Sequence, residues 1–429
     1  MPLVAPALAI PLLTASLWNG GQAEAERATA IGLAVAASFI AVAGFVLAIA
    51  TAGRGPRTGG VARTTVRLAA LGLGTAVLSG LALWGVLSWK DFVAPAEVGT
   101  AMQYFAMLAL LWLAGGLAMA AGRTGWASLA LPVGIAVGVV LRVGLDLSLV
   151  GAQSAGILTA AAIAALAALT TARKGYRRVR TPLAHRSVLV ALVLVGTAVG
   201  GMLFADRLAT WYSQRPFHSW ILRLQPDAEA GWDWAVVAVF GVVAVAASAA
   251  TRYWSNVARV ADRTPLTAGR AMSEEIRTSY RRTVGRLVIA GAVGAAVSFV
   301  GVVTWMALST SFSEVVSRDT AFVFAVVGPG LVILSWGALN AAVLLAMGRP
   351  DVAVLAAWLG LLVDAAVALP LSAHADGWTA SVGLLAGALV FLLVGLGPVR
   401  KVLRNADLVF ATGPERFPGR RRLNPVRWS

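Results

Sequence analysis

The hydrophobic pattern of the chain is a series of long apolar runs separated by short polar links. Each run has about the 20 apolar residues that a helix needs to cross the hydrocarbon core of a bilayer. The runs do not alternate as the strands of a membrane barrel do, and backbone groups in lipid must be paired within the segment, so the runs are helices. The sequence predicts an all-α polytopic membrane protein with about twelve transmembrane helices. The predicted spans are 2–18, 29–52, 68–88, 101–121, 126–150, 152–172, 187–205, 232–251, 287–309, 320–346, 352–372 and 378–399.

A repeated layout divides these spans into two sets of six. The stretches 111–169 and 336–399 have the same order of spans and short links, which favours a duplicated half-transporter. A shared bias toward Ala, Gly, Leu and Val is the alternative explanation. At an offset of 226 positions, Gly122-Arg123 falls on Gly348-Arg349, Gly134 on Gly360 and Gly151 on Gly377.

The repeat and the basic segments together predict the organisation of the chain. We expect a six-helix N-terminal half (1–172), a basic cytoplasmic linker (173–186), a six-helix C-terminal half (187–399) and a basic cytoplasmic tail (400–429). The link 206–231 is expected to be a loop on the opposite side, and 252–286 to form one or two surface helices.

The basic residues predict the orientation in the membrane. The net charge is +16, with 35 Lys and Arg. If the N-terminus is cytoplasmic, 28 of them fall in cytoplasmic segments and six in the opposite links, as the positive-inside rule requires. We therefore expect a multi-pass protein of the cell membrane with both termini in the cytoplasm. The charge indicates membrane lipids as partners and no nucleic acid.

Composition excludes several kinds of chemistry. Hydrophobic residues make up 59% of the chain, charged residues 13%, and there is no Cys. Disulfides, Fe–S clusters and thiol nucleophiles are thereby excluded. The three His fall in predicted loops, which argues against a haem held between helices. No P-loop, HExxH or GxSxG motif is present, so the sequence predicts no cofactor, no metal site and no enzyme.

Arg142 and Asp146 are the first candidate functional residues. They stand at i and i+4 in the predicted span 126–150, which places them on one helix face. A charge in mid-bilayer costs about 2.5–3.5 kcal/mol on insertion scales, so neither should face lipid. Two interpretations stay open. The pair lines a polar cavity that binds an anionic group or couples an ion, or the two charges neutralise each other and fix helix packing.

Asp364 and Asn340 are the candidates in the second half. Asp364 has no charged neighbour in its span and is a candidate proton or cation site. The alternative is a neutral acid bonded to a backbone carbonyl, or a partner of Arg142. Asn340 is typical of an interhelical hydrogen bond as well as of a ligand contact.

A third group closes the seventh span in GGMLFADRLATWYS. Asp206 and Arg207 are expected at the mouth of a cavity, where Trp211 could stack on a sugar. The alternative for Trp211 is the interfacial aromatic belt of any membrane protein.

Two stretches carry a resemblance to a known superfamily. NAAVLLAMGRPDVAVLAAWLGLLVDAAVAL at 340–369 joins a short Gly-Arg loop to a long span with a polar residue near its middle. With the two six-span halves, it resembles the multidrug/oligosaccharidyl-lipid/polysaccharide (MOP) flippases. GGMLFADRLATWYS and the basic stretch 252–287 are similar to membrane subunits of Pel-type exopolysaccharide exporters. Family members commonly have Asn where this chain has Asp364.

The resemblance implies a V-shaped bundle with a central cavity and alternating access. The cargo would be a polysaccharide or a lipid-linked oligosaccharide, with Arg142 on an anionic substrate group and Asp364 on the coupling ion. Glycan or glycolipid substrate and a cytoplasmic glycosyltransferase subunit are the partners it implies. The alternatives are an ion-coupled small-molecule or drug exporter, a membrane glycosyltransferase or polymerase, and a non-transporting scaffold of a synthase complex.

Overall fold

The chain forms a bundle of long helices in a computed structural model, and every regular element in the described part is helical. Eight of the described helices are long and apolar enough to span a membrane, and 129–144 is a shorter apolar helix. The predicted all-α polytopic fold is confirmed. The twelve spans stay a prediction, because almost all of 2–18 and residues 240–251 of the predicted span 232–251 lie outside the described residues. The linker 173–185, the first part of the expected surface helices (252–268) and the tail beyond 404 lie outside them as well. The structure describes residues 13, 22–52, 59–171, 186–213, 222–239, 269–308, 317–374 and 377–404.

Eleven labelled α-helices and two 3₁₀ turns make up the described part, together with an unlabelled helical segment at 226–239. In the N-terminal part these are α2 (Gln22–Ala52), α3 (Gly59–Lys90), η2 (Pro95–Glu97), α4 (Val98–Ala120), α5 (Thr124–Gly144) and α6 (Leu149–Thr171). In the C-terminal part they are α7 (Arg186–Met202), α8 (Ala205–Ser213), α10 (Gly269–Leu308), α11 (Arg318–Ala346), α12 (Pro350–His374), η4 (Gly377–Ser381) and α13 (Val382–Arg404).

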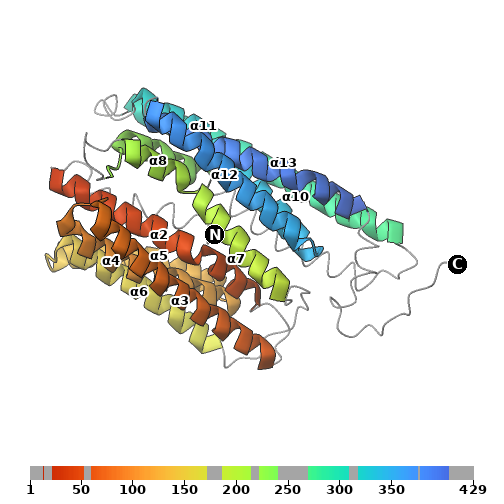
Figure 1. The fold of residues 1–429 in the computed structure, drawn as a ribbon, viewed down its shortest axis with the longest axis horizontal. Coiled ribbons are helices and arrows are strands. Elements are labelled where there is room, and N and C mark those ends of the chain that lie inside the picture. Colours follow the sequence, from red (N-terminus) through yellow and green to blue (C-terminus); the bar gives the residue numbers. More distant parts are fainter. Residues whose placement is uncertain are drawn as a thin grey trace.

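The helices are arranged as two groups with α7 and α8 between them. Figure 1 shows α2 to α6 on one side and α10 to α13 on the other. α7 packs against α2 of the first group and α12 of the second, while α8 packs against α12, η4 and α13. The pair α7–α8 therefore joins the two groups.

The contact between α2 and α7 depends on the absence of side chains. A Cβ on Gly44 would lie 2.0 Å from the carbonyl oxygen of Val193, and one on Gly196 would lie 2.6 Å from the Cα of Gly44. The backbones of the two helices thus touch directly, in the manner of small-residue contacts in membranes. Any side chain at Gly44 must push the helices apart.

The two groups contain the same local turn at the offset seen in the sequence. Gly122 and Gly348 both have a left-handed backbone, with φ of 77° and 72°, and each ends a helix. The next residue donates its N–H five residues back in both cases, from Arg123 to Ala118 at 2.9 Å and from Arg349 to Leu344 at 2.8 Å. This geometry satisfies the last helical carbonyls and requires glycine.

The helices after these turns also pack in the same way, but with a shifted register. Gly134 of α5 meets the backbone of Gly156 on α6, and Gly360 of α12 meets that of Gly387 on α13. These partners are 231 positions apart instead of 226, because the five residues of η4 precede α13. The predicted match of Gly151 with Gly377 therefore does not hold.

Three of the predicted boundaries are wrong. The seventh span does not end at residue 205, because helix continues through α8 to Ser213 after a turn at Leu203 and Phe204. The fifth span ends at Gly144 instead of residue 150. The basic stretch before residue 287 is not a separate surface helix where it is described, since α10 runs without a break from Gly269 to Leu308.

The glycine contact between α2 and α7 gives a direct test of the packing. Gly44→Ala is expected to lower the melting temperature of the protein in detergent, because overpacking against backbone costs about 1–3 kcal/mol or more. Gly74→Ala on α3 is the matched control, since no atom lies within 4 Å of a Cβ there and alanine favours helix. Equal melting temperatures for the two variants would contradict the close α2–α7 contact.

Candidate functional site

The short helix α8 carries three of the candidate functional residues, Asp206, Arg207 and Trp211. It follows the turn at Leu203 and Phe204, where Phe204 donates its N–H to Gly201 at 3.1 Å. Asp206 lies in the first turn of α8, where a carboxylate is favoured by the helix dipole. Its Oδ1 accepts the backbone N–H of Arg207 at 2.9 Å. Asp206, Arg207 and Trp211 are all buried.

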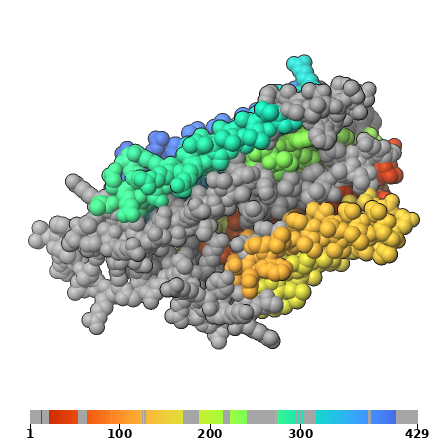
Figure 2. Space-filling model, turned by 180° about the vertical axis from the view of Figure 1, so that it is seen from behind, coloured from red at the N-terminus to blue at the C-terminus, as the bar shows by residue number. Residues whose placement is uncertain are grey.

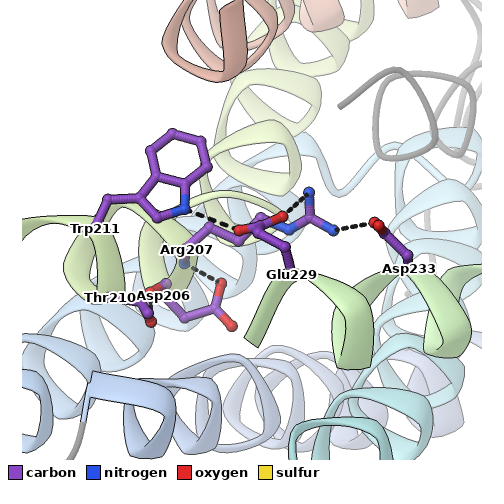
Figure 3. Close-up of polar contacts among 6 residues, drawn as sticks. All are labelled: Asp206, Arg207, Thr210, Trp211, Glu229 and Asp233. Atoms are coloured by element: carbon purple, nitrogen blue, oxygen red, sulfur yellow. Dashed lines mark hydrogen bonds and ion pairs between the residues drawn. The ribbon is translucent and has the colours of Figure 1, made fainter. Parts of the chain in front are cut away.

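Arg207 is held by two acids of the segment 226–239. Its Nη1 lies 3.1 Å from Glu229 Oε2, and its Nη2 lies 3.6 Å from Asp233 Oδ1 (Figure 3). The guanidinium also stacks over the ring of Trp232, 4.4 Å from its centroid. Glu229 and Asp233 are four residues apart on a helix, so both carboxylates reach one cation. A buried ion pair of this kind is stable only as a unit.

Trp211 connects this ion-pair network to the other half of the bundle. Its Nε1 donates to Glu229 Oε1 at 2.8 Å, and in Figure 3 the indole points from α8 toward Glu229. The far edge of the ring packs on α2, where a Cβ at Gly32 would lie 3.0 Å from Trp211 Cη2. Trp211 is fully buried, whereas the sequence placed it either against a sugar at the mouth of a cavity or in an interfacial aromatic belt.

Asp206 and Asp364 form a second pair of buried acids, one on α8 and one on α12. α8, α12 and η4 pack against one another, and the two carboxylates lie close enough to interact electrostatically. Gly383 on α13 leaves room for Asp364, since a Cβ there would lie 2.7 Å from its Oδ1. On α8, α12 and η4, four buried oxygens have no hydrogen-bond partner among the described residues. They are Asp206 Oδ2, both carboxylate oxygens of Asp364 and Ser381 Oγ.

The charges of this region do not balance. Four buried acids, at positions 206, 229, 233 and 364, face one described guanidinium. A buried carboxylate without a partner costs several kcal/mol, and the described residues leave this excess negative charge to be neutralised by protons or cations. The unpartnered carboxylate and hydroxyl oxygens of Asp206, Asp364 and Ser381 are the ligand types that small hard cations and protons take.

The structure separates Arg142 and Asp146 from this group. Their side chains are 50% and 97% exposed, and their nearest charged atoms are 3.6 Å apart. Arg142 lies in the last turn of α5 and donates to the carbonyl of Leu147 at 2.7 Å. Asp146 follows the helix with φ of 48°. The expectation of one helix face in mid-span is wrong for Asp146, because α5 has already ended.

Asn340 belongs to a different contact. It is fully buried on α11, and its Oδ1 accepts a hydrogen bond from the hydroxyl of Tyr280 on α10. Trp336 donates to the same hydroxyl at 3.3 Å. This arrangement is typical of polar contacts that fix helix packing in membranes. It does not include any of the four acids.

Sequence reasoning missed the acids that hold Arg207. Glu229 and Asp233 were placed in a loop and at the start of a span. The signal was present in the stretch EAGWD, in which two acids four residues apart flank a tryptophan. It becomes informative only when 226–239 is known to be helical. Ser381 gave no signal, since a serine in a small-residue stretch is common.

Comparisons with known proteins agree with the helical arrangement. No family model and no curated protein matches the chain. A MATE protein crystallised in complex with MaL6 matches with a TM-score of 0.61 over 94% of both chains, at 14% identity. A MATE protein in complex with Br-NRF matches with a TM-score of 0.51 at 13% identity, over 94% of both chains. The chain has a MATE-like fold.

A further match is weaker. An outward-facing multidrug resistance MATE family transporter of the MOP superfamily also matches over 94% of both chains, at 15% identity, but its TM-score is 0.46. The likeness concerns the fold, and the residues of the acidic group are properties of this chain.

Arg207 is expected to be essential for the stability of the site. Arg207→Gln leaves Glu229 and Asp233 buried without their cation, which costs about 3–5 kcal/mol. The variant should melt well below wild type in detergent. Arg349→Gln is the control, because its ion pair with Asp351 is half-exposed and such pairs contribute at most about 1 kcal/mol. A wild-type melting temperature for Arg207→Gln would contradict the buried network.

Proposed function

We propose that the protein is a membrane transporter that works by alternating access and is driven by protons or small cations. The observation that carries this proposal is the pair of buried carboxylates Asp206 and Asp364 in a MATE-like bundle. Asp206 Oδ2 and both oxygens of Asp364 have no hydrogen-bond partner among the described residues. Ionisable groups inside membrane helices are costly and are typical of ion pathways. In this proposal the two acids, with Ser381, bind the coupling ion.

The contact between the two halves near this site supports a gate. Leu222 donates its N–H to the carbonyl of Phe92 at 2.8 Å, and Leu224 donates to the hydroxyl of Thr29 on α2 at 3.0 Å. Arg223 donates to the carbonyl of Trp211 on α8 at 3.1 Å. Residues 222–224 therefore tie the N-terminal helices to α8 at the end of the bundle that carries the acids.

The gate and the ion site share Trp211. Its indole contacts Gly32 on α2 and Glu229 in the network of Arg207. A change of charge at Asp206 or Asp364 alters the field at the adjacent Arg207, and hence at Glu229. If ion binding weakens the contact between Trp211 and Gly32 on α2, this end of the bundle can open. Two packings of one interface are the usual basis of alternating access.

The substrate remains a proposal with two candidates. The sequence resemblance supports a polysaccharide or lipid-linked oligosaccharide, for which a cytoplasmic glycosyltransferase would be a partner. Export of a small molecule is the second candidate, and MATE proteins of this fold have been crystallised in complex with MaL6 and with Br-NRF. Glu229 and Asp233 are engaged in buried ion pairs with Arg207, which argues against their use as catalytic acids of a glycosyltransferase.

The remaining sequence expectations enter the proposal in a changed form. Arg142, which pairs with Asp146 at the exposed end of α5, would contact an anionic substrate group. Asn340 would act through helix packing. We keep the proposal of two six-helix halves, which the sequence repeat supports. We also keep the location in the cell membrane with both termini in the cytoplasm, which the distribution of basic residues supports.

The coupling-ion site is tested by transport in proteoliposomes. Asp364→Asn and Asp206→Asn should lower uptake driven by a proton or Na⁺ gradient by about 5–150-fold, the range of ordinary coupling free energies. Asp351→Asn is the control, since it removes a carboxylate from the same helix α12 at a half-exposed surface position. Two substrates are compared: a fluorescent lipid-linked oligosaccharide and an organic cation dye. Gradient-driven transport that survives in both acid variants would overturn the site.

The gate is tested at Gly32. Gly32→Val should push Trp211 away from α2 and open this end of the bundle, because a Cβ there is already 3.0 Å from the indole. The readout is the labelling rate of a single Cys at the buried position Ala209 in this Cys-free chain, with a membrane-impermeant thiol reagent. Gly99→Val on α4 is the control, since its surroundings are open. Faster labelling in Gly32→Val alone is expected, and equal rates would contradict the gate.

A further inference from the structure

One exposed face of helix α10 changes along its length from arginine to aliphatic side chains. At 1.5 Å per residue its 40 residues are about 60 Å long, roughly twice the hydrocarbon thickness of a bilayer. Figure 2 shows it as a continuous ridge on the surface of the bundle. Three exposed arginines each stand seven residues, or two turns, before an exposed aliphatic side chain on the same face. The pairs are Arg281 with Val288, Arg282 with Ile289, and Arg286 with Val293.

Helix α13, beside α10, shows the same change from exposed aliphatic to basic side chains, here toward its C-terminal end. The two helices are in contact, and Arg400 stands seven residues after the exposed Leu393. Lys401 and Arg404 are also exposed in the last turns of α13. Since α10 enters the bundle and α13 leaves it at the same end, six basic side chains meet there. We call these residues the basic collar: Arg281, Arg282, Arg286, Arg400, Lys401 and Arg404.

The depth of the basic collar matches the polar layer of a membrane. Ile289 and Val293 are 66% and 56% exposed and must face lipid in a membrane-embedded helix. Two turns place each arginine about 10 Å from its aliphatic partner along the axis. The headgroup region begins where the hydrocarbon ends and is about 5–7 Å thick on each side. The guanidinium groups therefore reach the lipid phosphates.

The charge of the basic collar is not neutralised within the described part of the protein. None of its six side chains forms an ion pair with a described residue. No acid occurs in 276–308 or in 382–404. The buried face of the same part of α10 is fixed instead by Ile276, Tyr280 and Leu287. The arginines are thus positioned by packing while their charges point outward.

We propose that the basic collar is a binding surface for anionic phospholipid of the adjacent leaflet, which the positive-inside rule makes the cytoplasmic one. Two neighbouring helices supply guanidinium groups that can each hold a phosphate in bidentate fashion. The aliphatic side chains two turns away contact the acyl chains of the same lipid. The surface is independent of the coupling-ion site, since it lies on the outer faces of α10 and α13.

Lipid binding to purified protein tests this surface without any transport measurement. Native mass spectrometry of the full chain in detergent is used to titrate dioleoylphosphatidylglycerol and, separately, dioleoylphosphatidylcholine. Each basic residue near an anionic headgroup contributes about fivefold to binding. Arg282→Gln with Arg286→Gln should therefore weaken phosphatidylglycerol binding about 30-fold and leave phosphatidylcholine binding unchanged. Arg282→Lys with Arg286→Lys should retain most of the affinity.

The control removes the same charge from the same predicted side of the membrane. Arg67→Gln with Arg349→Gln changes two exposed cations on α3 and in the α11–α12 turn, and its phosphatidylglycerol affinity should stay within about twofold of wild type. Melting temperatures show that each variant is folded. Wild-type affinity in the Arg282 and Arg286 double glutamine variant would overturn the proposal. An equal loss in the control would also overturn it, because the effect would then reflect net charge alone.

Discussion

The constraint on which the site depends is the imbalance of charge around Arg207. One guanidinium and four carboxylates are buried among helices, and only two of the acids pair with it directly. Burial makes each of these charges expensive unless it is neutralised. The network of Arg207, Glu229 and Asp233 satisfies part of this requirement within the protein. Asp206 and Asp364 are left with oxygens that have no hydrogen-bond partner among described residues. Their need for a proton or a cation is the basis of the proposed ion binding.

The local structure is arranged around that requirement. The turn at Leu203 and Phe204 separates α8 from α7 and places Asp206 and Arg207 in the first turn of a short helix. Gly383 on α13 makes room for the carboxylate of Asp364. Trp211 extends the network to α2 through Gly32, and the hydrogen bonds of 222–224 add a second link to the N-terminal helices. The acids, the cation and the contact between halves thus form one connected unit.

The sequence predicts the fold well and the site only in part, for physical reasons. A long apolar run in lipid must pair its backbone groups within the segment and therefore forms a helix. The helices and the Gly-Arg turns at Gly122 and Gly348 thus follow from the pattern alone. Asp364 and Asp206 could be found because an acid in an apolar run is costly. The pairing of Arg207 with Glu229 and Asp233 could not, because a polar stretch after an apolar run has the pattern of a loop whether or not it is helical and buried.

Arg142 and Asp146 show the opposite error, in which the sequence pattern predicts a buried pair that the structure does not have. Their spacing matched a helix face, yet α5 ends between the two residues, and both side chains are substantially exposed. Helix ends depend on a few backbone hydrogen bonds, such as that from Leu147 to Leu141, which spacing does not encode. Burial, more than spacing, distinguishes a charged pair that must be neutralised from one that water can solvate.

Infrared spectroscopy of the carboxyl groups tests the central claim most directly. The carbonyl stretch of a protonated carboxylic acid is separate from the bands of a carboxylate, and it can be recorded at neutral pH with and without Na⁺. The account predicts a protonated-carboxyl band in wild type that is missing in the Asp206→Asn and Asp364→Asn double variant. If Na⁺ replaces the proton, adding it removes the wild-type band as well. Spectra with no such band, identical in both proteins and unchanged by Na⁺, would show two ionised carboxylates side by side and would contradict the account.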